Sequence, residues 1–112
     1  MRAARYNRVC MPDRWIRVAA PDAVAPGRFI AVEVDGRTAL LHNVGGRYSC
    51  TGSVCPHQGR SLVTGTLEGP LLTCPWHAWV FDVTTGCSPW TLRAALPCLP
   101  VKVEADGIYV GL

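Results

Sequence analysis

Apolar and polar residues alternate over short stretches along most of this chain, which is the pattern of β-strands with one buried face. Eight such stretches are predicted as strands: Trp15–Ala19, Phe29–Val34, Thr38–Val44, Arg47–Ser53, Leu71–Cys74, Trp79–Val83, Val101–Glu104 and Ile108–Val110. The segment Pro21–Val24 is predicted as a short helical turn, and no longer window has helical periodicity. The pattern therefore predicts an all-β fold, a small antiparallel sandwich or barrel.

Turn signals separate these stretches. They are Asp35–Gly36, Gly45–Gly46, Thr85–Gly86 and Asp106–Gly107. An Asp–Gly or Gly–Gly pair can adopt the positive φ angles that two-residue hairpin loops require. Consecutive strands are therefore predicted to pair as antiparallel hairpins.

The basic residues of the chain gather at one end. With 112 residues the chain is long enough for one domain and one modest core. Five of its eleven basic residues lie in the first seventeen positions, where Asp13 is the single acidic residue. We therefore divide the chain into a basic arm, residues 1–14, and one folded domain, residues 15–112. The arm is expected to be solvated and to favour contact with an acidic partner rather than with nucleic acid.

Neither an export signal nor a membrane span is visible in the sequence. Charges interrupt the first twenty residues every few positions, and no apolar run approaches the length of a transmembrane helix. The cytoplasm is the expected compartment, with no membrane partner. In that compartment the six cysteines are expected to bind metal or to stay reduced, rather than to form a disulfide framework.

The strand pattern breaks at two places, and both breaks carry metal-binding side chains. The first reads V-C-P-H-Q-G, with Cys55 and His57 two positions apart. The second reads T-C-P-W-H-A-W-V-F-D, with Cys74 and His77 three positions apart. Each cysteine precedes a proline, which fixes φ and stiffens the loop between the two ligands. Two hairpin tips could thus close over one metal centre.

Two kinds of metal centre suit this donor set. Two thiolates and two imidazoles match tetrahedral zinc, but zinc sites usually group like ligands at each end of the motif. Here each loop mixes one cysteine with one histidine. This arrangement favours a 2Fe–2S cluster in which one iron takes two cysteines and the other takes two histidines, because each loop then contributes one ligand to each iron.

The two motifs resemble those of the Rieske ferredoxins that serve bacterial ring-hydroxylating dioxygenases and toluene-type diiron monooxygenases. The similarity runs from about Trp15 to Val110, with Ala78 where the family usually has glycine. It implies a Rieske-type antiparallel β sandwich with a two-hairpin cluster-binding subdomain. It also implies one Rieske-type 2Fe–2S cluster, held by Cys55, His57, Cys74 and His77.

The resemblance further indicates a cluster of low reduction potential. High-potential respiratory Rieske proteins carry a loop-to-loop disulfide at the positions of Arg60 and Trp76, and hydroxyl donors at those of Trp79 and Phe81. Hydrogen bonds to cluster sulfur raise the potential, and the Phe81 side chain cannot donate one. Arg60, the one charge within either ligand loop, is predicted to steer an acidic partner.

The remaining cysteines are assigned no role at the metal centre. Cys50 and Cys98 are predicted to be buried thiols, and Cys10 to be exposed in the arm. Cys87 is expected near the ligand loops, which leaves a Cys87–Cys98 disulfide as an open alternative.

One histidine outside the two motifs and three tryptophans are also assigned roles. His42 is predicted to be a structural histidine, on the surface or half-buried, rather than a ligand. Trp76 and Trp79 are expected to shield the cluster from water. Trp90 lies in a proline-containing segment that is expected to pack beside the cluster.

These observations predict a one-electron carrier that accepts electrons from an NAD(P)H-dependent flavin reductase and passes them to a terminal oxygenase of aromatic hydrocarbon catabolism. The chain itself is not expected to be an enzyme, because a mononuclear iron site needs two further histidines and a carboxylate, and only His42 remains. Two alternatives stay open at this point. They are the small subunit of an assimilatory nitrite reductase and a zinc-stabilised interaction module.

Overall fold

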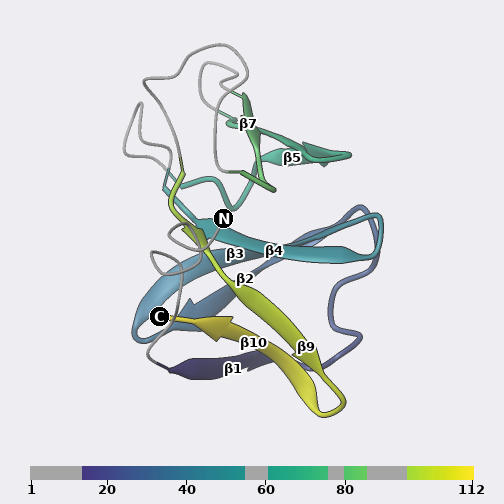
Figure 1. The fold of residues 1–112 in the computed structure, drawn as a ribbon. Coiled ribbons are helices and arrows are strands. Elements are labelled where there is room, and N and C mark those ends of the chain that lie inside the picture. Colours follow the sequence, from purple (N-terminus) through teal and green to yellow (C-terminus); the bar gives the residue numbers. More distant parts are fainter. Residues whose placement is uncertain (1–13, 55–60, 76–79, 86–95) are drawn as a thin grey trace, which may run out of the picture.

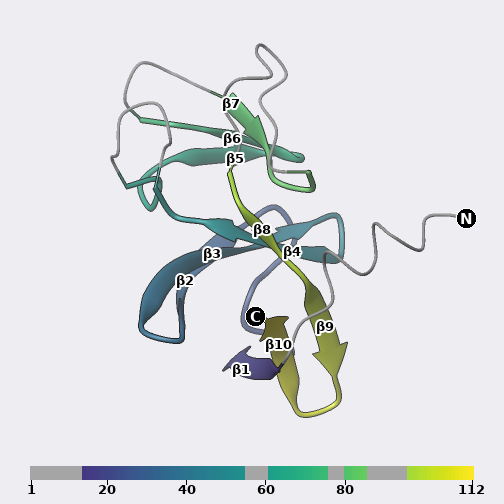
Figure 2. The ribbon, with the colours of Figure 1, turned by 60° about the vertical axis from the view of Figure 1, so that its left-hand side comes forward.

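The structure is a computed structural model that describes residues 14–54, 61–75, 80–85 and 96–112. Within these ranges the chain is all-β and antiparallel, and contains no helix. The strands are β1 (Trp15–Ala19), β2 (Phe29–Val34), β3 (Arg37–Val44), β4 (Arg47–Gly52), β5 (Thr66–Glu68), β6 (Leu71–Thr73), β7 (Val80–Asp82), β8 (Cys98–Leu99), β9 (Val101–Glu104) and β10 (Gly107–Gly111). They form three sheets, as Figures 1 and 2 show. The predicted fold class is confirmed.

The four-stranded sheet has the order β2-β3-β4-β8. Its two hairpins turn at Asp35–Gly36, with φ angles of 54° and 81°, and at Gly45–Gly46, with φ angles of 60° and 94°. These are the left-handed conformations that two-residue loops require, so both turns are confirmed.

A three-stranded sheet, β1-β10-β9, lies below the four-stranded one in Figure 1. The predicted turn at Asp106–Gly107 is wrong by one position, because Gly107 pairs with Glu104 and the loop residues are Ala105 and Asp106. Position 107 requires glycine because β1 passes close to its backbone. A Cβ atom there would lie 2.5 Å from Arg17 Nε and 2.9 Å from the Ala19 carbonyl oxygen, so β1 crosses too closely for a side chain. We call these two sheets together the base.

The third sheet, β5-β6-β7, is made of three-residue strands and is called the small sheet. It lies at the opposite end of the molecule from β1 and β10 (Figure 2). Two strands were not predicted from the sequence, β5 and the two-residue β8, because each is too short to display an alternating pattern.

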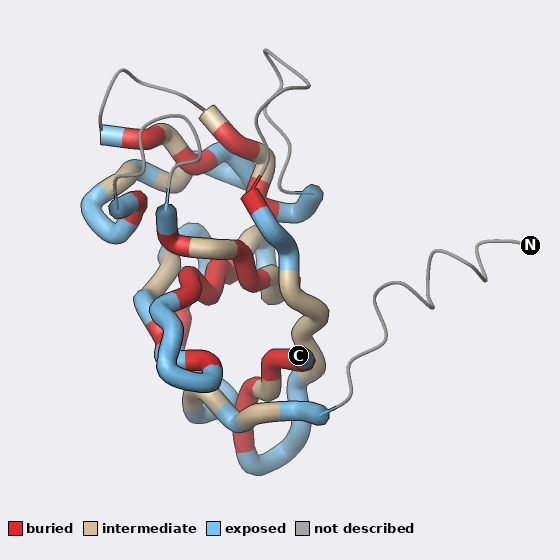
Figure 3. The backbone as a smooth tube through the Cα atoms, turned by 90° about the vertical axis from the view of Figure 1, so that its left-hand side faces the viewer, coloured by how far each residue is buried: buried red, intermediate tan, exposed pale blue. Residues whose placement is uncertain are grey.

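Two groups of buried side chains hold these layers together, and Figure 3 shows buried residues in both the lower and the upper part of the molecule. The base core consists of Val24, Val32, Val34, Ala39, Leu41, Cys50, Ile108 and Val110. The upper core consists of Leu40, Leu62, Leu72, Cys74, Phe81, Val83 and Leu96. Because Leu40 and Leu41 are neighbours on β3 and belong to different cores, this strand is covered on both faces.

The segment Pro21–Val24 forms a hydrogen-bonded turn, with Ala23 N donating to Ala20 O at 3.1 Å, and not the helical turn that was predicted. Asn43 Nδ2 donates to the Val24 carbonyl at 2.8 Å and fastens this turn to β3. A bilayer-spanning helix is not found in the part of the chain that the structure describes.

Candidate metal centre

Both ligand motifs lie in hairpins of matching size. An isolated bridge pairs Val54 with Ser61 and encloses residues 55–60. On the small sheet, Thr73 pairs with Val80 and encloses residues 74–79. Each hairpin therefore closes over six residues, and each cysteine of the two motifs is the first of its six. These two pairs agree with the prediction of two hairpins, whereas the arrangement of residues 55–60 and 76–79 lies outside the described residues.

The turn Leu62–Gly65 joins the bases of the two hairpins. Leu62 N donates to Ser53 O at 2.7 Å, which continues the first hairpin, and Gly65 N donates to Leu62 O at 2.9 Å. A Cβ atom on Gly65 would lie only 2.6 Å from the Thr73 carbonyl oxygen. Because this oxygen belongs to the backbone directly before Cys74, any residue larger than glycine would push the hairpins apart.

Cys74 follows β6 and has a 1% exposed side chain. It belongs to the upper core, together with the fully buried Leu62, Leu72 and Phe81. A thiol placed among apolar side chains at the mouth of a hairpin is shielded from solvent on the protein side. This environment fits a cluster ligand, since burial of an iron–sulfur centre limits access of water and tunes its potential.

Two further hydrogen bonds fix the end of β7 within the small sheet. Asp82 Oδ1 accepts a 2.9 Å hydrogen bond from Thr84 N, and Val83 N donates to Pro70 O at 2.8 Å. On the return of the chain, Gly52 N donates to Pro97 O at 2.9 Å. Val83, at the end of β7, and Pro97, before β8, are therefore each held by a backbone hydrogen bond.

Three of the four predicted ligands, Cys55, His57 and His77, lie outside the described residues. So do Arg60, Trp76, Trp79, Trp90, Cys10 and Cys87, and with them the Cys87–Cys98 alternative. Among the residues that are described, no group of three or more metal-binding side chains comes together. What the structure provides is therefore the position of Cys74 and the frame of both hairpins.

His42 is fully buried, so its predicted exposure was wrong. Its Nε2 atom lies 2.9 Å from Thr51 Oγ1, and its ring lies 5.6 Å from that of Phe29. Burial lowers the pKa of His42 from 6.5 to about 4, so the imidazole is neutral at pH 7. His42 lies two positions after Leu40 on β3, so the two side chains share the face that is turned to the upper core.

The two cysteines of the four-stranded sheet differ in exposure. Cys50 is buried as predicted, and burial together with nearby Cys98 raises its pKa to about 12. Such a thiol stays protonated and inert. Cys98 is exposed, so its predicted burial was wrong. The reason is that β8 is the edge strand of the sheet.

The sequence reasoning missed the residues that hold the two hairpins together, Leu62 and Gly65. A signal was present, because Gly65 sits between two threonines and outside every predicted turn. A lone glycine of this kind often marks close approach of another backbone. The partner of Gly65 could not be identified without the fold.

The sequence matches a known domain family. The profile described as "Rieske [2Fe-2S] domain" covers residues 14–100. A similar protein is the ferredoxin component of a naphthalene 1,2-dioxygenase system from Pseudomonas aeruginosa, 32% identical over 91% of this chain and 99% of its own length. Another is the ferredoxin component of the alkene monooxygenase system of Xanthobacter autotrophicus, 33% identical over 87% of this chain and 80% of its own length.

Solved structures give the same result. A chain in the complex of reduced oxygenase and oxidised ferredoxin of carbazole 1,9a-dioxygenase superposes with a TM-score of 0.78 at 30% identity, covering 87% of this chain and 92% of that one. The ferredoxin of carbazole 1,9a-dioxygenase from Nocardioides aromaticivorans superposes with a TM-score of 0.80 at 26% identity, covering 88% and 98%.

Proposed function

The chain belongs to the Rieske family, whose cofactor is one Rieske-type 2Fe–2S cluster, and we propose that it carries single electrons from a flavin-dependent, NAD(P)H-oxidising reductase to a terminal oxygenase. The observation that carries this proposal is the share of a known ferredoxin's length that the match covers. The match spans 99% of the naphthalene-system ferredoxin, so the likeness extends over almost the whole of that electron carrier. The relatives named above serve oxygenase systems, which favours this function over the nitrite reductase subunit and the zinc module.

We propose Cys55 and Cys74 as ligands of one iron, and His57 and His77 as ligands of the other. The six-residue hairpins support this assignment, because each offers one thiol and one imidazole from a closed loop. The burial of Cys74 at the mouth of the second hairpin supports it further. When bound, the cluster supplies a reversible one-electron couple. The protein holds the ligands and keeps water from the thiolate side.

The side chains around Cys74 favour a low potential. Phe81, in the same buried group, has no O–H to donate to sulfur, and neither do Leu62 and Leu72. These three side chains therefore offer no O–H donor that would stabilise the more negative reduced state. We expect a midpoint potential at or below about −100 mV, near the bottom of the Rieske range. A flavin reductase could then reduce the protein, and an oxygenase could oxidise it.

Purification followed by electron-transfer assays tests this function. The wild-type protein should be red-brown, give a Rieske electron paramagnetic resonance (EPR) spectrum after reduction, and take one electron per chain from NADH through a flavin reductase. Purified oxygenase components should then reoxidise it. A colourless zinc protein, or a midpoint above about +100 mV, would contradict the proposal.

The spectrum and potential can also be tested at named positions. Replacing His57 or His77 with alanine should abolish the Rieske spectrum, whereas His42→Gln should retain it. The substitution Phe81→Tyr should raise the midpoint potential if its hydroxyl reaches sulfur.

A further inference from the structure

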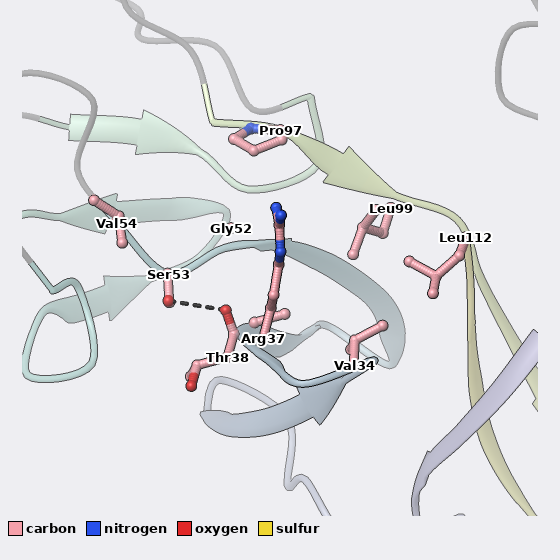
Figure 4. Close-up of a pocket in the computed structure, with 10 residues that line it drawn as sticks. Val34, Arg37, Thr38, Gly52, Ser53, Val54, Pro97, Leu99 and Leu112 are labelled. Carbon is pink, nitrogen blue, oxygen red and sulfur yellow. Dashed lines mark hydrogen bonds between the residues drawn. The ribbon is translucent and has the colours of Figure 1, made fainter. Parts of the chain in front are cut away.

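A groove of about 630 Å³ lies beside the base of the first ligand hairpin. Its walls come from the end of β2 and the start of β3, the end of β4 and the two residues after it, and β8 with the proline before it (Figure 4). Most of its lining is apolar, with Val34, Val54, Pro97, Leu99 and Leu112 among the side chains. A volume of this size accommodates several side chains of a bound segment.

One charged side chain lines this groove. Arg37 begins β3 and extends past Gly52 toward Pro97 (Figure 4). The carboxylate nearest to it in sequence, Asp35, is already paired with Arg14 at 2.9 Å. Within the described ranges that is the one ion pair, so no carboxylate there lies within ion-pair distance of Arg37. An exposed guanidinium above an apolar surface is suited to bind a carboxylate that arrives with an apolar neighbour.

The groove is also bordered by exposed apolar residues. Val54 is 51% exposed and Leu112 is 37% exposed. Val54 forms the last pair of the first hairpin, directly before Cys55. The apolar surface thus continues from the groove to the hairpin that carries a proposed cluster ligand. Contiguous exposed apolar surface of this kind marks interaction sites.

The described chain starts at the far rim of the groove. Leu112 N donates to Arg14 O at 3.0 Å, so the described chain begins at the edge of the groove. The preceding residues of the sequence contain Arg2, Arg5 and Arg8 against Asp13. This surplus of positive charge is complementary to an acidic surface and would speed encounter with one at low salt.

We propose that this groove docks an acidic segment of the terminal oxygenase, with an apolar side chain inserted beside Gly52 and a carboxylate bound by Arg37. The inference rests on the proposed function. The oxygenase is the chosen occupant because a 30% identical ferredoxin has been solved in complex with its oxygenase. Bound there, the segment would hold the oxygenase beside the first ligand hairpin without contacting the cluster itself.

Binding measurements on the full-length holoprotein test this inference. The probe is the oxygenase component that the wild-type protein reduces fastest, with both proteins oxidised so that no electron transfer occurs. Arg37→Glu should raise the Kd about tenfold at low salt, and Leu112→Asp about threefold. The matched control is Arg47→Glu, which makes the same charge change at the opposite end of the same sheet and should stay within about twofold. The EPR spectrum and midpoint potential should not change in any variant.

Three results would overturn the inference. One is an unchanged Kd for both Arg37→Glu and Leu112→Asp. Another is equal weakening by Arg47→Glu, which would indicate net charge rather than a groove. The third, from the same measurement made with the reductase as probe, is a loss of affinity for the reductase and none for the oxygenase. A wild-type protein that reduces no oxygenase would instead refute the proposed function, whereas wild-type transfer with unaffected variants would refute the groove alone.

Discussion

The base and the small sheet obtain their stability in different ways. The strands of the base, apart from the two-residue β8, are four to eight residues long and enclose a core of their own. The small sheet has strands of three residues, and its buried Leu72 and Phe81 pack against Leu40 of the base. A sheet this small cannot bury enough apolar surface by itself. The small sheet therefore depends for its stability on the base, and we expect it to gain further stability from the proposed cluster.

The largest expected effect separates two buried cysteines. Cys74→Ala should abolish the Rieske spectrum and bound iron, because it removes a thiolate from the small-sheet hairpin. Cys50→Ala removes a thiol from the base core and should keep both. Iron content per chain and EPR of the reduced protein measure the difference. A cluster that survives Cys74→Ala would remove this residue from the ligand set.

Removal of the cluster should affect the two regions unequally. Amides of residues 61–75 should exchange with solvent about a hundredfold faster in the apoprotein, because the ligand hairpins lose their cross-link. Amides of β2 to β4 should change by less than about threefold, since the base core contains none of the proposed ligands. Hydrogen exchange followed by mass spectrometry resolves these segments. Uniform acceleration would mean that the regions unfold as one unit.

A smaller effect concerns acid stability at the boundary between the regions. The pKa of His42 is about 4 in the folded protein, against about 6.5 when unfolded. The unfolded chain thus binds a proton first as the pH falls, so this contribution to stability is complete above pH 6.5 and is lost down to pH 4. The loss by pH 4 should be about 3 kcal/mol. The free energy of unfolding of wild type and His42→Gln, measured at several pH values, tests this loss. If the free energies of both proteins fell in parallel with pH, His42 would not be the cause.

The smallest effect tests the contact between the hairpins. Gly65→Ala should cost about 2 kcal/mol, because the new Cβ meets the Thr73 carbonyl and the backbone must shift. It should also change the EPR g values, which a purely structural loss elsewhere would not do. Gly69→Asn is the control. Gly69 has a φ of 58° and open space around its Cβ, and asparagine tolerates that conformation.

The accuracy of the sequence interpretation also differs between the regions. In the base, long alternating strands and glycine turns were predicted closely, because each signal lies within one hairpin. The errors there concern His42 and Cys98. Five successive residues of β3, from Ala39 to Asn43, are buried because sheets or turns cover both faces. Alternation within one strand does not reveal a second covering layer, and it does not reveal that β8 is an edge.

In the small sheet, the chemistry was easier to predict than the structure. The spacing of Cys55, His57, Cys74 and His77 indicated two hairpins, and the pairs at Val54 and Thr73 agree with it. The strand β5 was not predicted because its three residues are too few to display an alternating pattern. The role of Gly65 depends on a carbonyl eight positions away in sequence. Local patterns carry no information on such contacts.

The position of β10 has a consequence for the order of events during synthesis. It is the tenth strand in sequence but the middle strand of its sheet, and its Ile108 and Val110 are fully buried in the base core. While the ribosome is still adding residues 101–111, β1 has no strand to pair with and the base cannot close. Both ligand motifs are translated well before that moment. Insertion of iron and sulfide into a correctly held pair of hairpins should therefore follow the synthesis and pairing of β10.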